Sequence, residues 1–517
     1  MTSAARLVLT TETRLGAGAV VRTGSRAAYR SVGEIAGEPH FVRTELAASD
    51  DPSPVGDVIA CIAHLTDLHV TDVQSPGRFE WVNRYGQDPR FRELITMQRP
   101  QETLNMHAIA AMVRAINSLE ATPLTRGNVS LAVMTGDAVD NTQRNELANF
   151  LALMDGGTVR PDSGAAGYDG VQRADWPGDL YWKPDGPPQG DSFQSTLGFP
   201  RHPGLLEQAM QPFRSDGMGV PWLGCYGNHE EVCQGVGIVS EALARAMVGS
   251  RKAIEAPPGL VADGAVERFV QHPEQFLAGP SVEVAADPDR RPISRAEFVD
   301  AHVRNGGHGF TAAETGKACY VHDEGDVRYI TLDTVCDAGG ADGSVDAAQL
   351  HWLERRLEEV HSSFLTRDGS TARTRHADRY VVVLSHHGYD TLSNPRGERR
   401  ADALLSLLLR FRNVVLWLNG HIHANRITAR KEAGLGHGFW EVTTSSLVDW
   451  PCQARLVEIY RTRAGVAISC TMLDHEGGGL AGLHRELAGN VPRSGFDSWR
   501  PGSPPDRNAI LLLPSPF

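Results

Sequence analysis

Short, nearly continuous runs of apolar residues recur along the chain, separated by stretches in which apolar residues follow helical spacing. Continuous apolar runs are typical of strands that are buried on both faces. We predict strands at residues 58–66, 129–135, 220–226, 319–322, 327–333, 379–385, 414–419, 426–429, 438–444 and 454–460. Helical periodicity predicts helices at residues 102–119, 145–154, 241–248, 345–360 and 401–411. Strands that alternate with helices and then close in a run of strands predict an α/β protein with two sheets flanked by helices.

Two long segments, at residues 155–219 and 231–315, interrupt this alternation and show little periodicity. Long irregular segments in an ordered domain are usually functional, so we expect two irregular insertions over the active site that restrict its mouth. The aromatic side chains of the first insertion are expected to wall a pocket, with a sheet-edge cover or a dimer contact as the alternative; they are Trp176, Tyr181, Trp182 and Phe193. The remaining organisation is an N-terminal extension at 1–57 that includes a short hairpin, a main domain at 58–475, and a C-terminal tail at 476–517.

The composition narrows the class of protein. Of 517 residues, 41% are hydrophobic and 22% charged, which supplies a sizeable core and excludes a mainly disordered chain. The net charge of −13 disfavours nucleic acid as a partner, because an acidic surface repels phosphate backbones. Since no apolar run approaches the roughly 18 residues of a membrane span, we expect no membrane partner. The seven cysteines are scattered without a CxxC pair and the first residues do not read as a signal peptide, so we expect a cytoplasmic protein with reduced thiols.

Five of the predicted buried strands are each followed at once by a small group of polar residues. These groups are Thr66-Asp67-Leu68-His69, Gly136-Asp137-Ala138-Val139-Asp140-Asn141, Gly227-Asn228-His229-Glu230, Ser385-His386-His387-Gly388 and Gly420-His421-Ile422-His423. Open α/β folds bind ligands beyond the carboxyl ends of their strands. A single group of this kind is more often a turn or a solvated surface histidine, but five in one chain favour a metal site. The mixture of carboxylate, amide and imidazole suits Mn, Fe or Zn better than Ca or Cu(I).

The same residues carry a resemblance to a known family. The series Asp67-x-His69, Gly136-Asp137, Gly227-Asn228-His229-Glu230, His386 and Gly420-His421-x-His423 resembles the calcineurin-like metallophosphoesterase superfamily, over residues 58 to about 470. It matches the class III cyclic-nucleotide phosphodiesterase type and is similar to purple acid phosphatases at 227–230. Two positions depart from the purple enzymes: His69 stands where they carry another residue, and Asp140 stands where they carry a metal-binding Tyr. A purple Fe(III)–tyrosinate centre is therefore not expected. Segments 74–80 and 449–451 resemble a bacterial, largely actinobacterial, branch.

This resemblance implies a four-layer αββα sandwich of two mixed β-sheets flanked by helices, and a pair of divalent or trivalent metal ions, either Mn, Fe or Zn. It assigns the first ion to Asp67, His69 and His423, the second to Asn228, His386 and His421, and the shared position to Asp137. A shared carboxylate offsets the repulsion between two cations about 3.5–4 Å apart. A hydroxide that bridges the ions would be the nucleophile, so no Ser or Cys nucleophile is required.

The resemblance also implies catalytic roles for His229 and Asp140. His229 would protonate the leaving oxygen while the carboxylate of Asp140 orients its ring and raises its pKa; the alternative is a purely supporting hydrogen bond from His229. Substrate would contact Asn228 and His229. Two further histidines have open interpretations: His387 faces substrate or lies in the core, and His308, in a glycine-rich loop, contacts phosphate or is solvated. Residues with a supporting role near the ligands would be Asn141, Glu230 and Asp333.

We therefore predict a dinuclear metal-dependent phosphoester hydrolase, either a phosphatase or a phosphodiesterase, that acts on a small organic phosphate. An alternative within the same class is a diesterase for cyclic nucleotides or glycerophosphodiesters. An alternative of another class is a metal-binding protein of the same fold that performs non-phosphoester chemistry or sensing. The sequence leaves the natural substrate, the native metal pair and the oligomeric state open.

Overall fold

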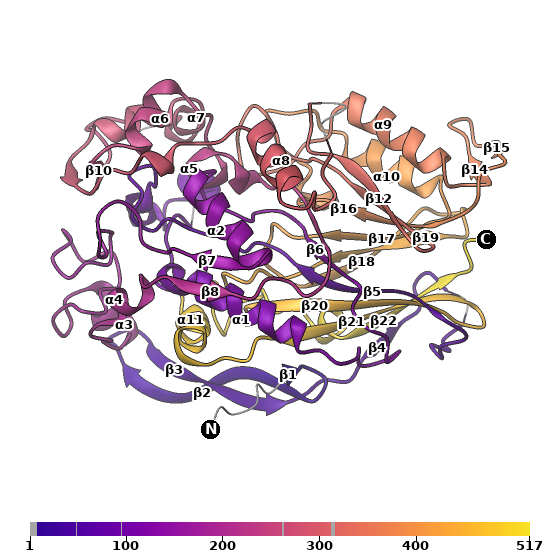
Figure 1. The fold of residues 1–517 in the computed structure, drawn as a ribbon, viewed down its shortest axis with the longest axis horizontal. Helices are drawn as coiled ribbons and strands as arrows, with labels where there is room; N and C mark the ends of the chain where they lie inside the picture. Colours follow the sequence, from indigo (N-terminus) through magenta and orange to yellow (C-terminus); the bar gives the residue numbers. More distant parts are fainter. Residues whose placement is uncertain (1–7, 48, 95, 261–262, 312–315) are drawn as a thin grey trace.

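Two mixed β-sheets pack face to face at the centre of the computed structural model, with helices outside them (Figure 1). The structure describes residues 8–47, 49–94, 96–260, 263–311 and 316–517. Apolar side chains from both sheets form one continuous cluster between them, for example Ile62 and Leu456 from one sheet and Val382 and Leu416 from the other. The predicted α/β class with two mixed sheets and flanking helices is confirmed at this level.

The larger sheet has eight strands. Its order is β4 (Phe41–Arg43), β22 (Ala509–Pro514), β21 (Gly465–Asp474), β20 (Gln453–Arg461), β5 (Val58–Leu65), β6 (Leu131–Met134) and β9 (Trp222–Gly224), with β1 (Val8–Leu9) also paired to β21. Strands β5, β6 and β9 are parallel to one another, so their carboxyl ends share one edge. Every residue of β6 and β9 is buried, as the continuous apolar pattern predicts.

The smaller sheet has six strands. Its order is β12 (Tyr320–Glu324), β13 (Val327–Thr331), β16 (Tyr380–Leu384), β17 (Val414–Asn419), β19 (Gly438–Thr443) and β18 (Arg426–Lys431). The four strands from β13 to β19 are parallel, and the two edge strands are antiparallel to their neighbours. Strands β16 and β17 are wholly buried, because the second face of this sheet is covered by helices.

Helices cover the outer face of each sheet. On the six-stranded sheet, α9 (Ala347–Glu358) and α10 (Ala401–Leu409) bury an apolar cluster that includes Trp352, Leu404 and Trp417. On the other side, α1 (Asn105–Asn117) and α2 (Arg144–Met154) pack on the eight-stranded sheet, and α11 (Gly479–Gly489) packs on α1. None of the helices in the described ranges combines the length and the apolar character needed to cross a bilayer.

The remaining elements lie outside the two main sheets and the helices that cover them. Four two-stranded sheets are formed by β2 (Thr13–Thr23) with β3 (Ala28–Ala36), β7 (Gly157–Val159) with β8 (Phe213–Ser215), β10 (Arg251–Ala253) with β11 (Ser281–Glu283), and β14 (Ser363–Leu365) with β15 (Thr371–Arg373). The other helices are α3 (Ser192–Leu197), α4 (Leu205–Ala209), α5 (Val232–Gly235), α6 (Glu241–Met247), α7 (Ala265–Gln271), α8 (Arg295–Arg304) and α12 (Pro504–Arg507). The hairpin expected near the N-terminus is β2–β3.

The predicted strands and helices all lie on observed elements, with ends that differ by a few residues. Four elements near the C-terminus were not predicted: β21, α11, α12 and β22. Strand pairing also runs across both expected domain boundaries, because β4 and β22 complete the eight-stranded sheet from the segments 1–57 and 476–517. The two terminal segments therefore build part of the main sheet.

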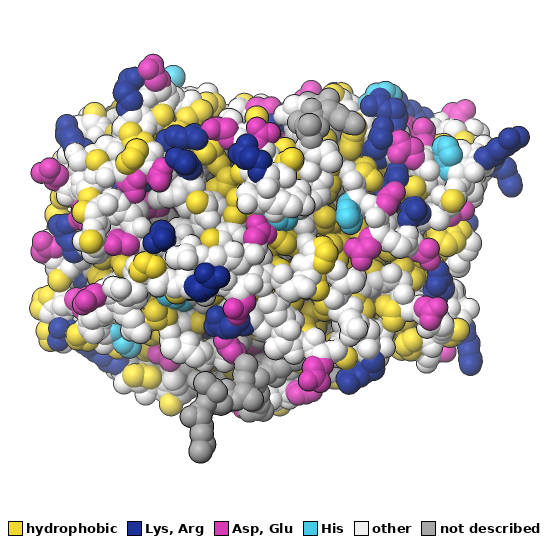
Figure 2. All heavy atoms as spheres, viewed as in Figure 1, with side chains coloured by type: hydrophobic (Ala, Val, Ile, Leu, Met, Phe, Trp, Pro, Cys, Tyr) yellow, Lys and Arg dark blue, Asp and Glu magenta, His cyan; other side chains and the backbone are white. Residues whose placement is uncertain are grey.

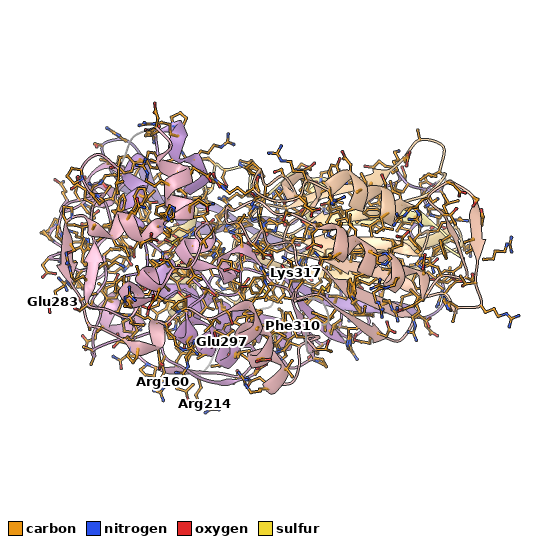
Figure 3. The ribbon with its side chains drawn as sticks, turned by 90° about the horizontal axis from the view of Figure 1, so that it is seen from above. Arg160, Arg214, Glu283, Glu297, Phe310 and Lys317 are labelled. Carbon is orange, nitrogen blue, oxygen red and sulfur yellow. The ribbon has the colours of Figure 1, made fainter. Side chains whose placement is uncertain are left out.

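Several elements of the two insertions, α3, α4, α6, α7 and β10, lie at one end of the molecule, at the left of Figure 1, whereas α8 lies near its middle. In the view from above, the labelled side chains of Arg160, Arg214 and Glu283 lie at the outer edge of this end (Figure 3). The aromatic residues of the first insertion do not wall a pocket at the predicted ligands. They pack in two apolar clusters that include residues from other segments: Trp182 and Phe193 lie in a cluster with Tyr29 and Leu487, and Trp176 and Tyr181 in one with Val284. Burial of these large rings therefore anchors the irregular segment to the rest of the molecule.

We expect Trp182→Ala to lower the free energy of unfolding by about 3–5 kcal/mol, because it empties a buried ring volume. Trp182 is 1% exposed, whereas Trp499, the matched control, is 65% exposed and should change stability by less than about 0.5 kcal/mol when replaced by Ala. Urea denaturation of both variants measures the difference. Equal effects of the two substitutions would contradict the packing role of Trp182.

Candidate metal centre

Five loops meet where parallel strands of the two sheets end. Asp67 and His69 follow β5, Asp137 follows β6, and Asn228 follows β9 in the eight-stranded sheet. His386 follows β16, and His421 and His423 follow β17, in the six-stranded sheet. The structure brings these seven side chains, all predicted as metal ligands, into one site. All are buried except His421, whose side chain is 13% exposed.

One group of ligand atoms lies around Asp67 and His423. His423 Nε2 is 3.2 Å from Asp67 Oδ1 and 3.1 Å from His69 Nε2. His69 Nε2 is 3.9 Å from Asp67 Oδ1 and 3.7 Å from Asp137 Oδ2. These four side chains offer ligand atoms that all lie within 4.8 Å of one another. Two imidazoles and two carboxylates at this spacing suit a transition metal ion.

A second group lies on the other side of Asp137. His386 Nε2 is 3.1 Å from Asp137 Oδ2 and 3.0 Å from Asn228 Oδ1. His421 Nδ1 is 3.1 Å from the same Asn228 oxygen. Asp137 Oδ2 is therefore close to histidines of both groups. The resemblance implied a shared position for Asp137, and the assignment of each ligand to one of the two ions stays a prediction.

The atoms that do not face the site are held by the protein. The second oxygen of Asp67 accepts hydrogen bonds from Thr66 Oγ1 and the His421 amide, and Asp137 Oδ1 accepts one from the His229 amide. Asp67 Oδ1 is buried and, among the described residues, has no hydrogen-bond partner. A buried carboxylate oxygen without a donor is costly. The buried His and Asp clusters thus fit a dinuclear metal site, because an ion there would satisfy this oxygen.

The histidines are oriented in the same way. His386 Nδ1 lies 2.8 Å from the carbonyl oxygen of Thr135, so it donates and leaves Nε2 free to bind. His423 Nδ1 lies 2.7 Å from Asp449 Oδ2, and His69 Nδ1 lies 3.2 Å from Asp140 Oδ1. Acceptors at the outer nitrogen fix the tautomer of a ligand histidine and increase its basicity.

The backbone of the ligand loops is itself unusual. Five ligand residues have left-handed conformations, with φ between 47° and 69°: Asp67, His69, Asp137, His421 and His423. Such residues cost about 1–3 kcal/mol each and persist only where the surroundings enforce them. Close approach also requires glycine at position 420, where a Cβ atom would lie 1.9 Å from Thr66 Oγ1 and 2.5 Å from Asp67 Oδ2.

One buried glutamate holds the Asp137 loop. The carboxylate of Glu230 accepts hydrogen bonds from the backbone amides of Gly227, Asp137, Ala138 and Val139. This matches its predicted supporting role. Asn141 was also predicted to support the ligands; it donates to the carbonyl oxygen of Gly77 and accepts from the Gln234 amide. Asp333, the third predicted supporting residue, accepts from the amides of Ala318 and Val335 instead of from a ligand.

Electrostatics favour cations at the centre. Burial alone would raise the pKa of Asp137, yet His386 and His229 hold it well below its usual range. Burial opposes protonation of His386, but the Asp137 carboxylate raises its pKa to about 9. Burial, together with His229, lowers the pKa of His69 to about 4, which keeps that ring neutral. Ionised carboxylates and neutral imidazoles are the forms that bind metal, so a bound ion would displace the proton that His386 otherwise holds beside Asp137.

A buried network of ion pairs, which the sequence analysis missed, links the supports of His69 and His423. Arg78 pairs with Asp140 and with Glu102 (2.7 Å). Arg99 pairs with Glu102 (3.2 Å) and with Asp449 (2.9 Å). All of these side chains are nearly inaccessible to solvent. Burial would raise the pKa values of Asp140 and Asp449, but Arg78 holds the pKa of Asp140, and Arg99 that of Asp449, well below the usual range. The only signal in the sequence was the resemblance of segments 74–80 and 449–451 to one branch of the family.

A pocket opens onto the two ligand groups and has a volume of about 160 Å³. Its wall includes four of the ligands together with residues from distant segments: Asp137, Asn228, His421, His423, His229, Glu93, Leu94, Thr96, Met97, Arg99, Gln234, Val236, Ala341, Ile422 and Arg500. The second insertion supplies Gln234 and Val236 to this wall, and the first supplies none of the residues above.

His229 and Asp140 lie together at the pocket. His229 Nδ1 is 3.3 Å from Asp140 Oδ1 and 3.0 Å from its carbonyl oxygen, while His229 Nε2 lies 4.0 Å from Asp137 Oδ2. Asp140 is shared, because its carboxylate also contacts His69 and Arg78. Burial opposes protonation of His229, but Asp137 and Asp140 outweigh it and raise its pKa. A protonated imidazole that borders the pocket can donate a proton.

The other two predicted histidines have hydrogen-bond or ring partners outside the two ligand groups, although one ring nitrogen of His387 lies within 4.8 Å of ligand atoms of His386 and His421. His387 is fully buried, and its nitrogens lie 2.9 Å from Thr334 Oγ1 and 2.9 Å from Ala341 O, as in a core histidine. His308 is not brought to the metal ligands. It stacks on Trp222, near the start of β9, and its Nε2 lies 3.0 Å from Asp155 Oδ1. The insertion therefore carries this histidine to the opposite end of the strand.

Comparison with known proteins gives distant structural similarity. Protein-family models and curated proteins yield no match to the sequence. A dimetal phosphatase from Danio rerio is 11% identical over 81% of this chain and 97% of that chain, with a TM-score of 0.34. The sulfate thiohydrolase SoxB from Thermus thermophilus, in complex with glycerol, is 13% identical over 84% of this chain and 60% of that chain, with a TM-score of 0.30. At this level of similarity, the chemistry must be argued from the site.

We expect the purified protein to bind two metal ions per chain, since Asp137 Oδ2 lies 3.7 Å from His69 Nε2 of one ligand group and 3.1 Å from His386 Nε2 of the other. Asp137→Asn should lower the content of both ions, because an amide cannot supply the shared negative charge. Elemental analysis after reconstitution measures the stoichiometry. One ion per chain in the unmodified protein, or loss of a single ion from the variant, would contradict the shared position.

We expect Asp449→Asn to weaken binding of the ion at Asp67, His69 and His423 by about 10–100-fold, because His423 loses the carboxylate that orients it. Competition with a chromophoric chelator measures the affinity. Asp474→Asn is the matched control, since Asp474 is equally buried (1% exposed) but lies on β21 beside Gln453. A similar loss in both variants would show a general effect of altering a buried aspartate.

Proposed function

We propose that this protein is a dinuclear metal-dependent phosphoester hydrolase of the calcineurin-like metallophosphoesterase type, with the four-layer αββα sandwich of that superfamily. The observation that carries the proposal is the position of Asp137 Oδ2 between two sets of buried His, Asp and Asn ligand atoms. The motif series in the sequence supports it independently. The donor set favours Mn, Fe or Zn.

Each residue has a defined role in this proposal. Bound metal ions would supply a water activated for attack and would neutralise charge on the phosphoryl oxygens. Asn228, His421 and His423, which line the pocket, orient the phosphoryl group. His229 gives a proton to the leaving oxygen, and Asp140 holds the His229 ring in place through its Nδ1. No Ser or Cys nucleophile is needed.

The pocket favours a small organic phosphate as substrate. Its volume of about 160 Å³ is smaller than the roughly 300–1,000 Å³ typical of pockets for larger ligands. Nucleic acid is not proposed as a partner, because the chain carries a net charge of −13 and basic and acidic side chains are mixed over the face in Figure 2. We propose that the protein acts in the cytoplasm and away from membranes.

A second function is a metal-binding protein that performs other chemistry or senses metal. The pairing of His229 with Asp140 favours hydrolysis, since a metal store needs no proton donor beside its pocket. Assays with an aryl phosphate monoester and an aryl diester, with Mn, Fe or Zn added, separate the two. Absence of hydrolysis from protein that holds both ions would favour the second function.

We expect His229→Ala to reduce kcat/KM for alkyl phosphates by about 100-fold or more, and for 4-nitrophenyl phosphate by less than about 10-fold. The reason is that a leaving group of low pKa needs little protonation, while an alkoxide depends on the acid. Steady-state kinetics on both substrates and elemental analysis test this, with His322→Ala on β12 as the control. Equal losses on both substrates would contradict the role of His229.

A further inference from the structure

Two arginines reach the pocket from segments that are far apart in the sequence. Arg99 precedes α1, and Arg500 lies between α11 and α12 near the C-terminus. Both line the pocket together with His229, His423 and Asn228. Their side chains are 7% and 21% exposed, so each guanidinium is largely withdrawn from bulk water. Two cations thus border the place where substrate would bind.

One carboxylate positions both guanidinium groups. Arg99 Nε donates to Asp449 Oδ1 at 2.9 Å, and Arg500 Nη1 lies 3.3 Å from Asp449 Oδ2. The latter oxygen is also 2.7 Å from His423 Nδ1. Arg500 Nη1 further lies near the carbonyl oxygens of Ile422 and His423. The arginines are therefore fixed relative to a metal ligand.

Both arginines have guanidinium N–H groups that no described residue accepts from. In the described part of the chain, no residue accepts a hydrogen bond from Nη2 of Arg99 or from Nε and Nη2 of Arg500. A guanidinium offers five N–H donors in a planar fork that matches phosphate oxygens. Besides the predicted ligand Asp137, the pocket wall in the described part of the chain has the carboxylate of Glu93. Glu93 is paired with Arg396 (2.8 Å) and does not accept from these donors.

We propose that Arg99 and Arg500 form an anion clamp that selects phosphomonoesters over phosphodiesters, an inference that rests on the proposed function. A monoester has three non-ester oxygens and a charge near −2, so one oxygen remains for the clamp when two face the metal ligands. A diester has a second ester group in that place, which leaves the guanidinium donors unpaired. Leaving such donors without partners is what makes polar sites discriminate strongly. The substrate class is thus a small phosphomonoester.

Arg500→Ala is the cleaner test, since Asp449 keeps Arg99 and His423 as partners. The substrates are 4-nitrophenyl phosphate and methyl 4-nitrophenyl phosphate, which share one leaving group. We expect kcat/KM for the monoester to fall about 10- to 100-fold, the worth of a charge-assisted hydrogen bond, and for the diester to fall less than about 3-fold. Arg500→Lys should lie between, because it keeps the charge without the fork. Arg461→Ala, on β20 and paired with Asp326, is the matched control and should change neither value.

Calorimetric binding of inorganic phosphate to the metal-loaded protein gives a readout without turnover. We expect Arg500→Ala to weaken phosphate binding about 10-fold or more and Arg461→Ala to leave it unchanged. Equal losses on the two esters, no loss on the monoester, or a wild-type preference for the diester would overturn the clamp while hydrolysis itself stands. If metal-loaded protein hydrolyses neither ester but phosphate binding still depends on Arg500, the proposed hydrolase function fails and the anion clamp remains. Should Arg500→Ala not fold, Arg500→Lys answers the same comparisons.

Discussion

The burial of the Asp137 carboxylate is the constraint on which the centre depends. It lies where parallel strands of two sheets end, and one of its oxygens faces histidines supplied by both sheets. An isolated buried carboxylate is expensive, so the fold must surround it with donors and cations. Glu230 fixes its loop from behind, the His229 amide binds its outer oxygen, and the inner oxygen is left for the site. Bringing these groups together costs conformational free energy, because five ligand residues adopt left-handed backbone conformations.

The next layer outward is ionic. Asp140 and Asp449 orient His69 and His423, and each is in turn held by an arginine, with Glu102 bridging Arg78 and Arg99. Removing one partner from a buried pair leaves an uncompensated charge and typically costs about 3–5 kcal/mol. The network therefore makes the geometry of His69 and His423 depend on Arg78, Glu102 and Arg99, which hold the carboxylates that orient these two rings. Arg99 also lines the pocket, together with Arg500.

The terminal segments take part in both the fold and the site. Strands β4 and β22 extend the eight-stranded sheet, and α11 packs on α1 beneath the loop that carries Arg99. The chain then passes the pocket, where it places Arg500, before it returns to the sheet as β22. By contrast, the large aromatic residues of the first insertion pack in apolar clusters that they share with other segments, and His308 of the second insertion lies at the far end of β9.

The sequence by itself determined the alternation of strands and helices and the polar groups that follow the buried strands. Both signals are local: a strand buried on two faces must be apolar throughout, and ligands at strand ends must directly follow it. It did not reveal β22, Arg99, Arg500 or the role of Asp449, because β22 pairs with β21 and both arginines pair with Asp449, tens to hundreds of residues away, and no local pattern encodes such pairing. The aromatic residues of the first insertion could, by their sequence, either line a pocket or fill an apolar cluster. Only the tertiary structure decided between these alternatives, by packing the rings with apolar residues of distant segments such as Tyr29 and Val284, and it alone placed the two arginines against Asp449.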